Sequence, residues 1–207
     1  MLCARKKEEQ VADLELARAA AKLDDKARHD LAERLFDRVR GTVHYLVAGD
    51  DEADDLTQIA LVEILRCAEN FRGDGRLEAW ADRITVRTVM RALEKRRRWW
   101  SKLIFFGAPE EGSTRGDQQP EGELSRRQLQ QRLGEKLKRL SIKLRVVVVL
   151  HWVHGHTVAE VAEICDAKVN TVRDRLRTAK KKLKKMVLAD PALAPWFNEQ
   201  SIVRAKR

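Results

Sequence analysis

The feature that most constrains the fold is a regular spacing of apolar residues toward the C-terminal end. Val169, Val172, Leu176, Ala179 and Leu183 follow one another at intervals of 3 and 4, which is the spacing of residues along one face of an α-helix. The whole chain of 207 residues holds only 10 glycines and 4 prolines. So few chain breakers argue against many short strands and turns, and the sequence predicts an all-α fold.

A short helix is predicted directly before this one. Thr157 and Glu160 have the spacing of a capping box, in which each side chain bonds the backbone N–H of the other. Residues 166–168 then break the apolar pattern, and Asp166 tolerates the left-handed backbone of a tight break. Two short helices around such a break are typical of a helix-turn-helix. The valine-rich run 146–150 finds no strand to pair with, so we expect a buried supporting helix there.

Positive charge gathers on the predicted second helix of this motif. Residues 168–185 carry nine lysines and arginines against one aspartate, in a chain whose net charge is +10. A helix fits the major groove of DNA, where side chains near its start reach base edges and later basic residues meet phosphates. The pattern therefore predicts DNA binding. The alternative is a helical hairpin with lysine-rich, solubilising ends.

An earlier segment, residues 24–100, shows the same helical periodicity. Asp50 or Asp51 is expected to cap its second helix, which ends at about Ala68, and a turn-rich loop over residues 70–75 follows. Its first helix is indicated by apolar residues at every fourth position, Leu31, Leu35, Val39 and Val43.

A third helix is predicted in this segment from about Leu77 to Arg98. One of its faces is apolar, whereas another carries basic residues spaced by four, which is typical of contact with an anionic partner. These basic residues are Arg83, Arg87, Arg91 and Lys95.

Glycine and proline concentrate between the two helical segments. This composition predicts a flexible linker over residues 101–122. We therefore expect two small helical domains, 24–100 and 123–187, of which the second contains the helix-turn-helix. The extensions 1–23 and 188–207 have no role that the sequence indicates, although the first has a helical and charged composition.

Enzymatic and metal chemistry find little support. The chain shows no phosphate-binding loop and no convincing nucleophile–base pair, so no catalytic residue, no cofactor and no metal ligand is assigned. His151, His154 and His156 lie close together; we expect satisfied or surface histidines near a helix junction, and a metal site is the alternative. Only three cysteines occur, far apart, which favours a reducing, cytoplasmic environment. No apolar run approaches 18 residues, so no membrane insertion is expected.

Taken in order, these features resemble the extracytoplasmic-function (ECF) class of bacterial RNA polymerase sigma factors, within the sigma-70 family. The resemblance rests on short segments of both domains and on their order along the chain. They are Ala53-Asp54-Asp55-Leu56-Thr57-Gln58, Phe71-Arg72-Gly73-Asp74, Trp80 with Arg83-Ile84, residues 157–163 and residues 169–176.

The resemblance implies a sigma factor that binds core RNA polymerase and directs promoter-specific initiation. In such proteins the first segment docks on the clamp helices of the largest subunit, which here implies Asp54, Asp55 and Gln58. The flap of the second-largest subunit, promoter DNA and an anti-sigma factor are the other partners that the resemblance suggests.

The resemblance also assigns DNA contacts to both domains. The first domain would melt the promoter and engage the minus-ten element. The residues assigned to this role are Phe71, Arg72, Asp74, Arg83, Arg87, Arg91 and Lys95. The helix-turn-helix would read the minus-thirty-five element. The residues assigned to it are Thr157, Lys168, Asn170, Thr171, Arg173, Asp174, Arg177 and Lys181. A stand-alone helix-turn-helix regulator and a histidine-based metal sensor are the alternative functions.

Overall fold

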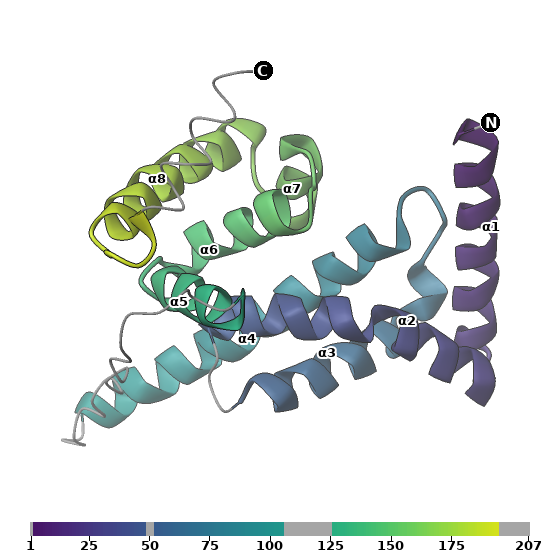
Figure 1. The fold of residues 1–207 in the computed structure, drawn as a ribbon. Helices are drawn as coiled ribbons and strands as arrows, with labels where there is room; N and C mark the ends of the chain where they lie inside the picture. The colour runs from purple at the N-terminus through teal and green to yellow at the C-terminus, as the bar shows by residue number, and fades with distance from the viewer. Residues whose placement is uncertain (1, 49–51, 106–125, 195–207) are drawn as a thin grey trace.

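The computed structural model describes residues 2–48, 52–105 and 126–194, and within these ranges every regular element is a helix (Figure 1). The expected all-α architecture is confirmed. None of the described helices is long and apolar enough to cross a membrane. In chain order the elements are α1 (Leu2–Ala21), α2 (Asp25–Val43), the π-helical turn η1 (His44–Ala48), α3 (Ala53–Arg66), the 3-10 turn η2 (Ala68–Asn70), α4 (Leu77–Phe105), α5 (Arg126–Lys138), α6 (Ile142–Val148), the π-helical turn η3 (Val149–Val153), α7 (Val158–Ile164) and α8 (Val169–Leu188).

Helices α2, α3 and α4 pack pairwise and form the first domain. Asp24 caps α2 by accepting a hydrogen bond from the backbone N–H of Ala27 at 2.8 Å, as its residue type favours. The periodic residues Leu31, Leu35 and Val39 are at most 1% exposed. The fourfold apolar spacing in the sequence therefore identified the buried face of this helix correctly.

The N-terminal extension forms α1, as its composition indicated, and packs across the first domain. Ala17 is buried against α2, and the carboxylate of Asp13 lies 2.5 Å from the guanidinium of Arg34. Leu14 sits against Gly73, which has a φ of 77°. A Cβ at that position would lie 3.3 Å from Leu14 and would strain the backbone, so α1 supports the loop between η2 and α4.

Two helix boundaries differ from the expected ones. Asp50 and Asp51 lie outside the described residues, and α3 begins after Glu52, whose side chain makes no capping hydrogen bond. Helix α4 continues to Phe105 instead of ending near Arg98. Its last turn therefore occupies the start of the expected linker, and the rest of that linker up to residue 125 lies outside the described residues.

Helices α5 to α8 form the second domain. The valine run forms α6 and η3, and Val147, Val149 and Leu150 are fully buried, so the expected supporting helix is confirmed. The capping box at the start of α7 is present. Asp166, in the turn before α8, has a φ of 49°, which is the left-handed backbone that the break required.

The two domains pack directly against each other. One cluster of buried apolar residues runs through both of them, and Tyr45 in η1 packs on the second-domain cluster around Leu137 and Leu144. In Figure 1 the second domain lies above α2 and α4, whereas α3 lies below α2. No sequence pattern indicated this contact, because the glycine- and proline-rich segment pointed to tethered modules.

Candidate nucleic-acid interface

The start of α8 presents polar side chains to solvent. Asn170, Arg173, Asp174 and Arg177 are exposed, and they pair along the helix surface. The guanidinium of Arg173 donates to the Asn170 Oδ1 atom at 3.1 Å, and that of Arg177 lies 3.5 Å from the Asp174 carboxylate. Pairs this exposed contribute little to stability, so these side chains can exchange their neighbours for DNA groups at low cost.

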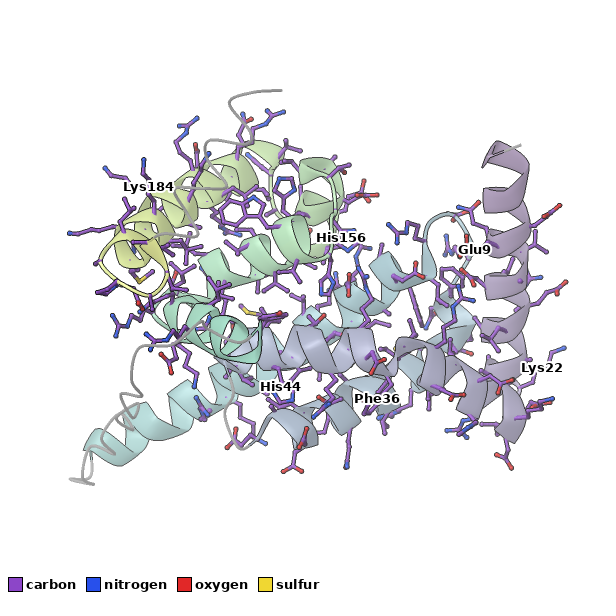
Figure 2. The ribbon with its side chains drawn as sticks, in the orientation of Figure 1. Glu9, Lys22, Phe36, His44, His156 and Lys184 are labelled. Atoms are coloured by element: carbon purple, nitrogen blue, oxygen red, sulfur yellow. The ribbon has the colours of Figure 1, made fainter. Side chains whose placement is uncertain are left out.

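The opposite face of α8 is apolar and holds the helix in place. Val172 and Ala179 are fully buried, and Leu176 is 9% exposed. The lysines along the second half, Lys181 and Lys184 among them, face solvent, and Figure 2 shows Lys184 projecting from the outer side of the helix. The packing of the apolar face therefore orients the polar residues outward. Lys168, the N-cap of α8, is exposed, and Thr171 is half-buried.

Thr157 is the N-cap of α7, and its side chain is already bonded in the capping box, unlike the other predicted DNA contacts. Its backbone N–H donates to a Glu160 carboxylate oxygen at 2.7 Å, and its hydroxyl oxygen accepts from the Glu160 N–H at 3.2 Å. The first of these bonds lowers the pKa of Glu160 more than any other contact does. Thr157 thus fixes the start of α7, and its contact with DNA stays a prediction.

A basic stripe follows α4. Arg87, Arg91 and Lys95 are exposed, as the spacing by four predicted. Arg83 is half-buried, and its guanidinium donates to the backbone carbonyl of Glu163 in α7 at 2.8 Å. The first residue of the stripe is therefore occupied by the second domain, whereas the other three are accessible to an anionic ligand.

The loop between η2 and α4 borders a cavity of about 290 Å³. Arg72 and Asp74 are exposed at its rim, whereas Phe71 is only 5% exposed. The ring centroids of Phe71 and Trp80 are 5.4 Å apart, so the phenylalanine packs beneath the loop. In this conformation its ring is not available to stack on a nucleobase, and its predicted contact with DNA stays untested.

The acidic edge of α3 is open to solvent. Asp54, Asp55 and Gln58 are all exposed, and Asp54 lies 3.5 Å from the imidazole of His44. Sequence reasoning missed two apolar neighbours on the same helix, Ile59 and Val62, which are 49% and 53% exposed. Phe36 on α2 is also exposed (Figure 2). Exposed apolar side chains beside an acidic edge are typical of a protein-binding surface.

The three clustered histidines all form hydrogen bonds within the protein. His156 is fully buried, and its Nε2–H donates to the Asp82 carboxylate at 2.6 Å. His154 lies 2.7 Å from the Thr42 hydroxyl, and His151 bonds the backbone carbonyl of His156. Across the described ranges, no three His, Cys, Asp or Glu side chains converge on a point where a metal ion could bind. Each ring has a hydrogen-bonding partner at this helix junction, whereas the Nδ1 atom of the buried His156 has none among the described residues.

Asp82 is the centre of this junction, although no sequence pattern singled it out. It is 1% exposed and receives three hydrogen bonds from the Arg38 guanidinium, at 2.7, 3.0 and 3.2 Å. Burial alone would raise the pKa of Asp82, but the hydrogen bonds from His156 and Arg38 outweigh burial and hold the pKa below its ordinary value. Burial lowers the pKa of His154 to about 4, so this ring is neutral near pH 7.

The geometry defines a two-domain, helical protein with an exposed, basic helix-turn-helix and a separate acidic edge. Residues 31–99 match the family model described as Sigma-70 region 2, and residues 130–183 match Sigma-70, region 4. The chain is 30% identical over 178 residues to the ECF RNA polymerase sigma-E factor of Escherichia coli (strain K12), covering 83% of this chain and 92% of the relative. The chain therefore belongs to the ECF group of the sigma-70 family.

Other relatives agree with this assignment. The sigma-E factor of Haemophilus influenzae is 26% identical over 184 residues, covering 86% of this chain and 97% of that protein. The structure of the sigma factor RpoE in complex with the anti-sigma factor NepR from Bartonella quintana has a TM-score of 0.60 at 21% identity, covering 77% of this chain and 95% of that one. CnrH in complex with the cytosolic domain of CnrY also gives 0.60 at 21% identity, over 86% and 99% of the two chains. Both structures share the fold.

Membership of the family gives the function. The protein is a sigma factor, which binds core RNA polymerase and directs promoter-specific initiation of transcription. The family match favours this function over a stand-alone helix-turn-helix regulator and over a metal sensor.

Proposed function

We propose that the acidic edge of α3 is where this sigma factor docks on core polymerase. Asp55 and Gln58 are exposed, and the flanking Ile59 and Val62 add apolar area. Carboxylates can pair with basic side chains of the partner, and the apolar residues supply the burial that a stable interface needs. The clamp helices of the largest subunit are the partner proposed for this edge, and the flap of the second-largest subunit is proposed for the second domain.

The two DNA elements are proposed to bind separate domains. The exposed start of α8, with Asn170 and Arg173, reads the minus-thirty-five element in the major groove. The loop with Arg72 and Asp74 captures an unpaired base of the minus-ten element, and the stripe on α4 holds the separated strand through its phosphates. The observation that supports this division is that both surfaces are basic and lie on different domains.

Co-purification with core RNA polymerase tests the docking edge. The double variant Asp55→Lys, Gln58→Ala reverses one charge and removes one amide on an exposed face, so the fold should be kept while polymerase binding is lost. Glu15→Lys, an exposed charge reversal on α1, is the matched control and should bind as the wild type does. Equal retention of both variants on core polymerase would show that α3 is not the docking edge.

A protein inhibitor and a cytoplasmic location are further proposals. One solved structure of the same fold is a complex with an anti-sigma factor, and this chain has exposed apolar side chains on both α2 and α3 that a partner could cover. We propose that such a partner binds this chain as well, and that the protein works in the cytoplasm beside the polymerase. Adding core polymerase to this protein bound to such an inhibitor tests whether both partners use the same surface. A shared surface predicts that polymerase releases the inhibitor.

A further inference from the structure

The loop between η2 and α4 does not hold its own shape. Two of its residues are glycines, Gly73 and Gly75, and glycine allows more backbone conformations than any other residue. Within the described ranges, residues 72–75 make no backbone–backbone hydrogen bond, and Arg72 and Asp74 are exposed. Contacts from outside the loop therefore select the conformation that the loop has in the structure.

Helix α1 supplies such a contact in the middle of the loop. A Cβ on Gly73 would lie 3.3, 3.5 and 3.6 Å from three carbon atoms of Leu14, so the glycine backbone packs directly on this leucine side chain. Ala17 and Ala20 of α1 are at most 1% exposed, and their small side chains allow the close approach of α1 to the rest of the first domain. In Figure 1 the loop that leads into α4 lies beside α1.

Ion pairs fix where α1 lies on the first domain. Asp13 is 3% exposed, and its carboxylate lies 2.5 Å from the guanidinium of Arg34 on α2. A buried ion pair restrains the two helices that carry it, because separating the pair leaves a charge without a partner. The same guanidinium lies 3.9 Å from the carboxylate of Glu78 in the first turn of α4. Glu78 in turn lies 3.4 Å from Arg76, so Arg34 connects α1 to the place where the loop ends.

We propose that α1 is a positioning element for minus-ten recognition, in which Leu14 packs against Gly73 and holds the loop in the conformation that receives the unpaired base. This inference rests on the proposed role of the loop. A loop that is already fixed in its binding conformation loses less freedom when it binds, so the contact favours capture of the base. Leu14 acts through the loop and not by touching DNA. The N-terminal extension thereby has a role, although its sequence indicated none.

Limited trypsin digestion of the full-length protein tests whether Leu14 orders the loop. Arg72 and Arg76 are exposed, and trypsin cleaves after arginine where the chain leaves its folded conformation. Leu14→Ala removes the contact, so cleavage after these two arginines, followed by mass spectrometry, should become about tenfold faster. Leu16→Ala removes the same atoms from another half-buried leucine of α1. It is the matched control, and its loop should be cleaved at the wild-type rate.

Transcription by core RNA polymerase with each variant tests the consequence for promoter choice. The templates are promoters randomised in the minus-ten or in the minus-thirty-five element. Leu14→Ala should reduce the preference for the best base at the minus-ten position read by the loop by about tenfold, because initiation then proceeds more often without capture of that base. Its preference within the minus-thirty-five element should stay at the wild-type level. A general loss of stability would lower transcription from all promoters alike, so this pattern separates positioning from structural support.

Two further variants complete the experiment. Leu14→Val, a smaller truncation, replaces Leu14→Ala if circular dichroism shows that the alanine variant does not fold, and should change cleavage and preference in the same direction. Asp74→Ala alters the exposed loop itself and should reduce the same minus-ten preference.

Equal cleavage of the loop in the Leu14→Ala and Leu16→Ala proteins would overturn the proposal. An unchanged minus-ten preference in a Leu14→Ala protein whose loop is cleaved faster would also overturn it. If Asp74→Ala leaves the preference unchanged, the proposed role of the loop is wrong, and the inference falls for that reason alone. The two kinds of failure are distinguishable because digestion needs neither polymerase nor promoter.

Discussion

At the scale of single residues, Leu23 is a point of strain. It follows α1 with a φ of 65° and is 72% exposed. A left-handed backbone costs a residue with a Cβ roughly 1–2 kcal/mol, and the position after a helix usually holds glycine for that reason. We predict that Leu23→Gly raises the free energy of unfolding by about 1 kcal/mol, a shift of about 2–4 °C in Tm for a chain of this size.

The matched control for this prediction is Leu23→Ala, which keeps the Cβ and with it the backbone strain. Thermal unfolding by circular dichroism should show no gain for alanine and a gain for glycine. An equal rise in both would mean that removal of the exposed leucine side chain, and not relief of φ, stabilises the protein.

Single residues were also the level at which the sequence was most ambiguous. The capping role of Thr157 could be predicted because it depends on residues three apart. The burial of Phe71 against Trp80 depends on the path of the loop in between, which sequence spacing does not determine. Asp82 looked like any other charge on an amphipathic helix, since its partners Arg38 and His156 are 44 and 74 residues away.

At the scale of elements, the prediction concerns the two halves of α8. Arg173 lies in its second turn, where side chains reach base edges, and Lys184 lies toward its end, where they meet phosphates. We predict that Arg173→Ala costs the holoenzyme about 1–3 kcal/mol on a preferred promoter and relaxes its choice at one base pair. Lys184→Ala should weaken binding to all promoters alike and reduce the salt slope by about 1.

Transcription from a promoter library randomised in the minus-thirty-five element, repeated over a range of salt concentrations, separates the two effects. If both variants shift all promoters by the same factor, the start of α8 does not read bases. If Lys184→Ala changes base preference, the reading face extends further along the helix than its position suggests.

Helices and their faces were predictable from the sequence because the determinants are local. Apolar residues every third or fourth position marked the buried faces of α2 and α8, and the broken pattern at Asp166 marked the turn. Ends were less certain: α4 passes its expected end by seven residues, since nothing in Trp99 to Phe105 stops a helix. The first chain breakers after α4 are Gly107 and Pro109, and they mark the observed end better than the charged run before Trp99 does.

At the scale of the whole molecule, the packing of the two domains could not be predicted. The buried surfaces that join them are apolar residues of ordinary helices, and His154 and His156 read equally well as histidines at any helix junction. The packing also depends on which surfaces of the two domains fit each other, and residue spacing within either domain does not determine that fit. The family resemblance supplied the roles of both domains without indicating that they pack against each other.

The contact between the two domains should weaken in mild acid. Burial lowers the pKa of His154 to about 4 in this contact, against an ordinary value near 6.5 once the domains separate. The charged or titratable groups that influence it are Asp82, Arg38 and His156. With its domains in contact the protein therefore binds fewer protons, so the contact is fully stable above pH 6.5 and is weakened progressively as the pH falls toward 4.

At pH 5.5 the ratio of protein with separated domains to protein with packed domains should be about tenfold higher than at pH 7.5. The lowered pKa of Asp82 destabilises the contact only when the pH falls below the ordinary value near 4, so it does not contribute in this range. Small-angle scattering from pH 7.5 to 5.5 measures the change, and His154→Asn, which cannot titrate, should flatten it. A pH response of the same size in that variant would assign the effect to another group. The two proteins differ in this pH range only in that the His154 ring takes up a proton and asparagine does not.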